Sequence, residues 1–121
     1  NANPGSVRAA IDLLAGCGGR RTLVLGAMRE LGPDSENLHR EIGVYAREAG
    51  IDSLWGVGEE LHPAVEAFGQ GGRFFADREA ALMALPGAFA SADTVLVKGS
   101  RGAAMEVLLQ ALLQPGSGGG N

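Results

Sequence analysis

Short runs of aliphatic and β-branched residues alternate with longer helical segments, and this alternation constrains the fold most. The runs are continuously apolar, which is typical of strands covered on both faces of a sheet. Strands that alternate with helices across short connections are parallel, because each helix returns the chain to the same edge of the sheet. The sequence therefore predicts an α/β fold: a three-layer sandwich around a mainly parallel sheet.

Periodicity and local punctuation place the individual elements. Asn3 followed by Pro4 is a helix start, and Asp77 is placed to cap a later helix. Strands are expected at 22–25, 54–57, 73–75 and 94–97. Helices are expected at 4–15, 34–49, 59–68, 77–85 and 103–113. In the commonest doubly wound order the strands lie 3-2-1-4, so the sandwich is Rossmann-like and its first and fourth strands meet at the switch point.

Composition fits one globular domain. The chain has 121 residues, of which 45% are hydrophobic and 20% charged. This length and composition support a packed core and exclude wholesale disorder. The 20 glycines follow no fixed period, which excludes a collagen-like fold. We expect residues 1–113 to form the domain and the glycine-rich 114–121 to be a flexible tail. Because the chain opens at Asn1 rather than at a methionine, we also expect it to be part of a larger protein.

Charge and cysteine content limit the classes of partner. The net charge is −4, so no general attraction to nucleic acid or to an anionic membrane is expected, and any phosphate binding must be local. The single cysteine, Cys17, excludes an intrachain disulfide framework and fits a reducing compartment. The sequence has no apolar run near the ~20 residues of a membrane span. A cytoplasmic protein without membrane insertion is the expectation.

Two loops are expected at the switch point, where Rossmann-like folds bind ligands. Lys98, the only lysine, follows the fourth strand and begins the segment Lys98-Gly99-Ser100-Arg101. Two cations, a hydroxyl and free helix amides would suit an anion there, although the same residues also fit a plain helix start capped by Ser100. The other loop, 27–32, carries Arg29 and Glu30, which either contact a ligand or pair with each other in solvent.

Several kinds of site are missing from the sequence. It has no GxxxxGK[ST] loop for a nucleoside triphosphate and no GxGxxG after the first strand for a dinucleotide. His39 and His62 have no neighbours at metal-ligand spacing, so a metal site is not expected. The methionines, Met28 and Met83 among them, are interpreted as core or loop packing.

Five segments in order resemble the C-terminal domain of the Mur ligases. They are NANPGS at 1–6, LVLGAMRELG at 23–32, SExxH at 35–39, FAD at 75–77 and LVKGSR at 96–101. The likeness covers 1–113 and is greatest for the family branch that adds D-alanyl-D-alanine. Two positions depart from the family pattern: Ala27 replaces a common aspartate, and Gly102 replaces a common serine.

The resemblance implies one domain of a three-domain cytoplasmic enzyme of peptidoglycan synthesis. An N-terminal domain would hold UDP-N-acetylmuramoyl-tripeptide, and a central domain would carry the phosphate loop for ATP and Mg²⁺. The C-terminal domain would close over ATP and bind D-Ala-D-Ala, which the enzyme joins to the tripeptide through an acyl phosphate.

The resemblance also assigns residues. It implies an ATP-binding edge at Asn1 and Asn3, and a surface facing the dipeptide and phosphates at Lys98, Ser100 and Arg101. No catalytic residue and no metal ligand is expected within this domain, so the fragment alone is expected to be inactive. One alternative is a free-standing, non-catalytic Rossmann-like module that binds an anion or a partner protein. Another is a Mur ligase that adds a different amino acid.

Overall fold

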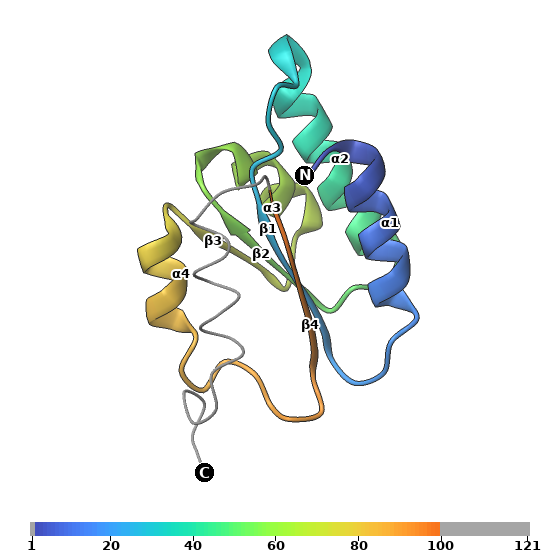
Figure 1. Cartoon of the computed structure of the whole chain (residues 1–121), viewed down its shortest axis with the longest axis vertical. Coiled ribbons are helices and arrows are strands. Elements are labelled where there is room, and N and C mark those ends of the chain that lie inside the picture. Colours follow the sequence, from blue (N-terminus) through green and yellow to red (C-terminus); the bar gives the residue numbers. More distant parts are fainter. Residues whose placement is uncertain (1, 100–121) are drawn as a thin grey trace.

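A computed structural model describes residues 2–99, and Figure 1 shows a sheet with helices on both of its faces. Asn1, Ser100, Arg101, the predicted helix at 103–113 and the predicted tail at 114–121 lie outside the described residues. Within the described part, no helix combines the length and the apolar character that a membrane span needs.

The predicted order of helices and strands is confirmed over the described residues. The strands are β1 (Arg21–Gly26), β2 (Ser53–Val57), β3 (Gly72–Phe75) and β4 (Thr94–Lys98). The helices are α1 (Pro4–Ala15), α2 (Ser35–Glu48), α3 (His62–Phe68) and α4 (Arg78–Ala84). Single 3-10 turns, η1 (Gly32–Asp34) and η2 (Glu59–Leu61), precede α2 and α3, so the predicted helices at 34–49 and 59–68 each begin with a tighter turn.

All four strands are parallel and lie in the order β3-β2-β1-β4, as predicted. β1 is central, and its Leu25 pairs with Gly56 of β2 on one side and with Lys98 of β4 on the other. The chain leaves β1 toward β2 and later returns to β4 on the opposite side. The switch point therefore lies between the carboxyl ends of β1 and β4.

Alternate residues of the strands build two cores. Leu23, Leu25 and Leu54 face α1, α2 and α3, and they join one buried cluster with residues of these helices. Val24 and Trp55 face the other way, toward α4 and the segment that follows it. Successive strand side chains point to opposite faces, so continuous apolar runs require cover on both. Figure 1 shows α1 and α4 on opposite sides of the sheet, which confirms the three-layer sandwich.

Side-chain caps explain where two helices begin. The Asn3 Oδ1 atom accepts a hydrogen bond from the Ser6 amide at 2.9 Å, and the Ser6 hydroxyl accepts one from the Asn3 amide at 3.0 Å. This reciprocal capping box starts α1. Asp77 caps α4 by accepting from the Ala80 amide at 2.9 Å. Both predicted starts are confirmed.

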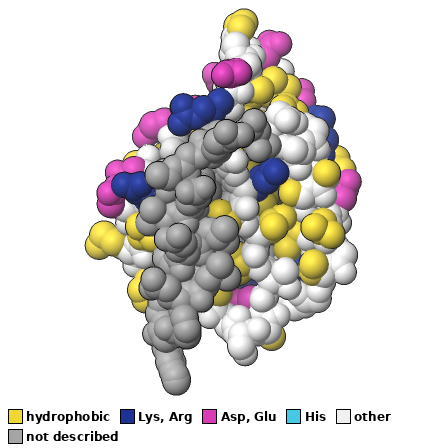
Figure 2. Space-filling view, viewed as in Figure 1, with side chains coloured by type: hydrophobic (Ala, Val, Ile, Leu, Met, Phe, Trp, Pro, Cys, Tyr) yellow, Lys and Arg dark blue, Asp and Glu magenta, His cyan; other side chains and the backbone are white. Residues whose placement is uncertain are grey.

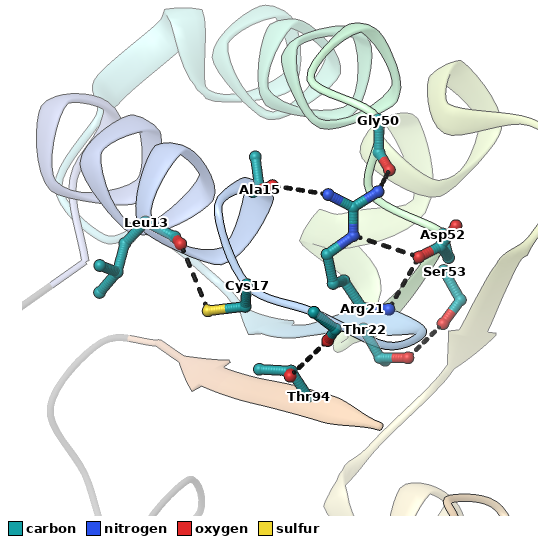
Figure 3. A network of polar contacts seen from close by, with 10 residues as sticks. Leu13, Ala15, Cys17, Arg21, Thr22, Gly50, Asp52, Ser53 and Thr94 are labelled. Atoms are coloured by element: carbon teal, nitrogen blue, oxygen red, sulfur yellow. Dashed lines mark hydrogen bonds and ion pairs between the residues drawn. The ribbon is translucent and has the colours of Figure 1, made fainter. Parts of the chain in front are cut away.

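A polar network lies at the amino ends of the strands, at the edge of the sheet opposite the switch point (Figure 3). The Arg21 guanidinium donates to the carbonyl oxygens of Ala15 and Gly50. Ala15 is the last residue of α1, and Gly50 lies just after the end of α2. The same side chain is 3.3 Å from an Asp52 carboxylate oxygen, which also accepts from the Arg21 amide at 2.8 Å. One cation thereby joins two helix ends to the first strand.

Two expectations need correction. The fourth strand runs one residue further than predicted, to Lys98, and all five of its residues are half-buried rather than buried, because β4 lies at the edge of the sheet. Met83 is 83% exposed on α4, so its interpretation as core packing is wrong. Met28 is 3% exposed, and its interpretation as a packing residue is confirmed.

Candidate functional site

The candidate site is the carboxyl edge of the sheet beside the switch point. β1 ends at Gly26 and continues into the loop 27–32, while β4 ends at Lys98, directly beside Leu25. The loop 27–32 and Lys98, which begins the second predicted segment, thus lie at adjacent strand ends, whereas Ser100 and Arg101 of that segment lie outside the described residues. Figure 1 shows the loop and η1 extending beyond the sheet at this end, with the start of α1 nearby.

The loop 27–32 is anchored at one end and exposed at the other. Met28 is buried in the core shared by α1, α2 and α3, whereas Arg29 and Glu30 are exposed. Glu30 has a φ of 61°, in the left-handed region that glutamate seldom adopts. Together with Ser35 and Glu60, the loop lines an open hollow of about 400 Å³. Side chains of both charges therefore surround this hollow.

The His39 ring contacts the anchored end of the loop, a contact that we did not predict from the sequence. Its ring is fully buried at 0% exposure in α2. Nε2 accepts a hydrogen bond from the Met28 amide at 3.1 Å, and Nδ1 lies 2.8 Å from the Ser35 carbonyl oxygen. The sequence signals were its place in the SExxH segment at 35–39 and its position on the apolar face of the helix, three residues before Ile42.

Lys98 is half-buried at the end of β4. Because side chains alternate along a strand, Lys98 lies on the same face as Leu96, which packs against the core of α1, α2 and α3. The start of α1, a helix capped by Asn3, lies at this end of the sheet (Figure 1). A lone ammonium group and a helix N-terminus at one sheet edge both favour an anionic ligand there.

Charges on the visible face are mixed. Figure 2 shows lysine and arginine side chains standing singly among acidic ones, with no continuous basic patch on the described part of this face. No three His, Cys, Asp or Glu side chains among residues 2–99 group as metal ligands. Any anion or metal-bound ligand at the carboxyl edge would thus be recognised locally rather than by a broad field.

A parallel, doubly wound sheet with loops gathered at its switch point places the domain in the Rossmann-like class of folds. Residues 1–101 match the family described as "Mur ligase, glutamate ligase domain", and the chain belongs to this family.

Individual relatives show which members of the family the chain resembles. The chain is 44% identical over 119 residues to the UDP-N-acetylmuramoyl-tripeptide–D-alanyl-D-alanine ligase of Escherichia coli strain K12, covering 97% of this chain and 26% of that protein. The MurF structure from Acinetobacter baumannii superposes with a TM-score of 0.82 at 32% identity, covering 93% of this chain and 25% of the other. The MurF ligase of Thermotoga maritima, solved with ADP, gives 0.73 at 28% identity, covering 91% and 25%. The chain spans about a quarter of the length of these relatives.

Proposed function

We propose that this chain is the C-terminal domain of a cytoplasmic, ATP-dependent ligase that joins D-alanyl-D-alanine to UDP-N-acetylmuramoyl-tripeptide during peptidoglycan synthesis. The proposal draws on the likeness to ligases of that name, which extends over nearly the whole chain. In this reaction the tripeptide carboxylate is phosphorylated by ATP, and the dipeptide amine displaces phosphate to form the amide. The domain would contribute by closing over the reacting groups.

The observation that carries the proposal is the pairing of Leu25 with Lys98. It brings the only lysine to the strand end beside the loop 27–32, at the switch point where this class of fold binds ligands. Negative charge is present on the acyl phosphate and develops on the carbonyl oxygen as the amine attacks. A fixed ammonium group near these atoms would stabilise the transition state more than the ground state.

We assign the remaining residues as follows. Ser100 and Arg101 would extend the anion site from Lys98 toward the dipeptide carboxylate, which a guanidinium can grip with two parallel hydrogen bonds. Asn1 and Asn3 would face the nucleotide from the start of α1. Arg29 and Glu30 would line the crevice from the opposite loop.

ATP and Mg²⁺ would be bound mainly by the other domains of the longer enzyme. The sequence has no phosphate-binding GxxxxGK[ST] loop, and residues 2–99 group no set of metal ligands. The N-terminal and central domains of the same enzyme are accordingly its proposed partners, and the substrates are small molecules rather than nucleic acid.

Replacing Lys98 in the longer enzyme tests the proposal. We expect Lys98→Ala to lower the turnover of ATP-dependent amide formation by ~10²-fold, the usual scale for one electrostatic contact in a transition state. The melting temperature should change little. Arg78→Ala is the matched control, since Arg78 is a surface cation on α4 that pairs with its neighbour Glu79 at 3.6 Å. Normal turnover of the Lys98→Ala enzyme would contradict the proposed site.

A further inference from the structure

The imidazole of His39 is the most conspicuous group near the carboxyl edge without an assigned role. The ring is fully buried, and both nitrogens are engaged by neighbouring backbone atoms. The other histidine, His62, has a side chain 54% exposed and lies 4.0 Å from Glu66 on the surface of α3. Burial and backbone contacts thus single out His39.

Its two contacts with backbone atoms fix the tautomer. The Ser35 carbonyl oxygen can only accept, so Nδ1 carries the proton and donates to it at 2.8 Å. The Met28 amide can only donate, so Nε2 offers its lone pair at 3.1 Å. The ring is therefore neutral. A second proton on Nε2 would point at the Met28 N–H and would break this bond.

The bond from Met28 connects the start of the loop 27–32 to the first turns of α2. The Met28 side chain is 3% exposed, and the backbone amide bonded to His39 lies in a buried environment. Without an acceptor this amide would lose its partner away from water, which is unfavourable. Only two residues later the chain passes through Glu30 at a φ of 61°, a conformation kept only when its surroundings fix the backbone.

We propose that His39 is a positioning residue. Its neutral imidazole holds the loop 27–32 in the conformation that lines the hollow at the carboxyl edge, and ligand binding there depends on this bond. The part concerning ligand binding rests on the proposed function, whereas the loop-holding part stands on the geometry of this chain alone.

Two variants separate the acceptor from the shape of the ring. His39→Gln places an amide oxygen near the position of Nε2 and keeps an acceptor for the Met28 amide. His39→Phe keeps the ring but offers no acceptor. His62→Gln is the matched control, because it removes the exposed histidine.

Nuclear magnetic resonance of the 121-residue chain reads out the loop. In the unaltered chain we expect the ¹⁵N shifts of His39 to report a protonated Nδ1 and an unprotonated Nε2. In His39→Phe, amide exchange at Met28 should accelerate ~10- to 100-fold beyond any change at Leu25 in β1, the range that matches loss of one buried hydrogen bond. His39→Gln and His62→Gln should keep the Met28 amide protected.

The same variants in the longer ligase test whether substrate binding depends on the contact between His39 and Met28. We expect His39→Phe to raise KM for the dipeptide at least ~10-fold, and His39→Gln to restore it.

An Nε2–H tautomer, or unchanged Met28 exchange in His39→Phe, would overturn the positioning role. Loosened Met28 with unchanged KM would overturn its link to ligand binding. If the longer protein has no ligase activity at all, the proposed function fails while the resonance measurements still decide the loop contact.

Discussion

Asn3 has two assignments that one substitution can separate. Its Oδ1 atom is occupied by the Ser6 amide at 2.9 Å, so the side chain already serves α1 as a cap. We expect Asn3→Ala to lower the free energy of unfolding by about 1 kcal/mol, the usual loss for a helix cap. If Asn3 also faces the nucleotide, KM for ATP in the longer enzyme should rise.

Asn3→Asp provides the control, because aspartate caps a helix equally well but replaces the amide with a negative charge. We expect it to retain the stability measured by urea unfolding and still to raise KM for ATP. A normal KM in both variants would leave Asn3 with a structural role only.

At the amino edge of the sheet, Asp52 makes the stability of the fold depend on pH. The hydrogen bond from the Arg21 backbone amide, followed by the bonds and charge of the Arg21 side chain, outweighs desolvation and lowers the pKa of Asp52. Because the folded pKa lies below the unfolded value of about 3.9, the stabilisation is complete above that value and is lost as the pH falls through the folded pKa. As the pH is lowered from neutral to strongly acidic, the free energy of unfolding falls in the unaltered chain. We expect it to fall less in Asp52→Asn.

Helix packing depends on a glycine that helix propensity disfavours. A Cβ at Gly43 in α2 would lie 2.1 Å from the Ala64 carbonyl oxygen of α3, whereas a Cβ at Gly5 in α1 would meet only the Asn3 Oδ1 atom, at 3.5 Å. We expect Gly43→Ala to destabilise the fold by about 1–3 kcal/mol, because a backbone contact cannot yield as a side chain can. Gly5→Ala should instead stabilise it by up to about 1 kcal/mol through helix propensity. Thermal unfolding of both variants measures these effects. Equal changes in melting temperature in the two variants would contradict the prediction.

Among the elements, the alternation of apolar runs and helical segments was enough to predict the order, the parallel sheet and the 3-2-1-4 arrangement. Element ends were less predictable. The 3-10 turn η1 arises where Gly32 adopts a φ of 70° before Pro33, and the extension of β4 to Lys98 follows from its pairing with Leu25. A single sequence carries the local signals for a turn, whereas strand pairing depends on residues far apart in the chain.

The candidate site was predictable only as far as topology determines it. Lys98 and the loop 27–32 lie at one sheet edge because β1 and β4 are neighbours, and this followed from the strand order. The role of His39 did not follow, since its partner Met28 is 11 residues away and belongs to an irregular loop. The conformation of Glu30 was equally hidden, because glutamate gives no signal for a positive φ.

At the scale of the whole molecule, the two ends of the sheet carry different kinds of structure. The amino edge is closed by Arg21, which bonds to the ends of α1 and α2 and to Asp52 (Figure 3). The carboxyl edge carries the loop 27–32 and the half-buried Lys98. Folds commonly carry their binding groups on loops that a regular scaffold positions, and the carboxyl edge is where such loops lie in this chain.

The last prediction concerns the chain by itself. Its two cores are continuous on both faces of the sheet, so we expect the 121-residue chain to fold cooperatively, with coincident transitions by circular dichroism and tryptophan fluorescence. Trp55, buried in the second core, provides the fluorescence signal. We expect no amide formation, because the sequence lacks a phosphate-binding loop and catalysis requires the reactants to be held together in one closed site. Phosphate release from ATP, with tripeptide precursor and D-Ala-D-Ala present, measures this, and the longer enzyme is the positive control. Turnover by the chain alone would contradict the proposed division of labour, because it would place the catalytic groups within these 121 residues.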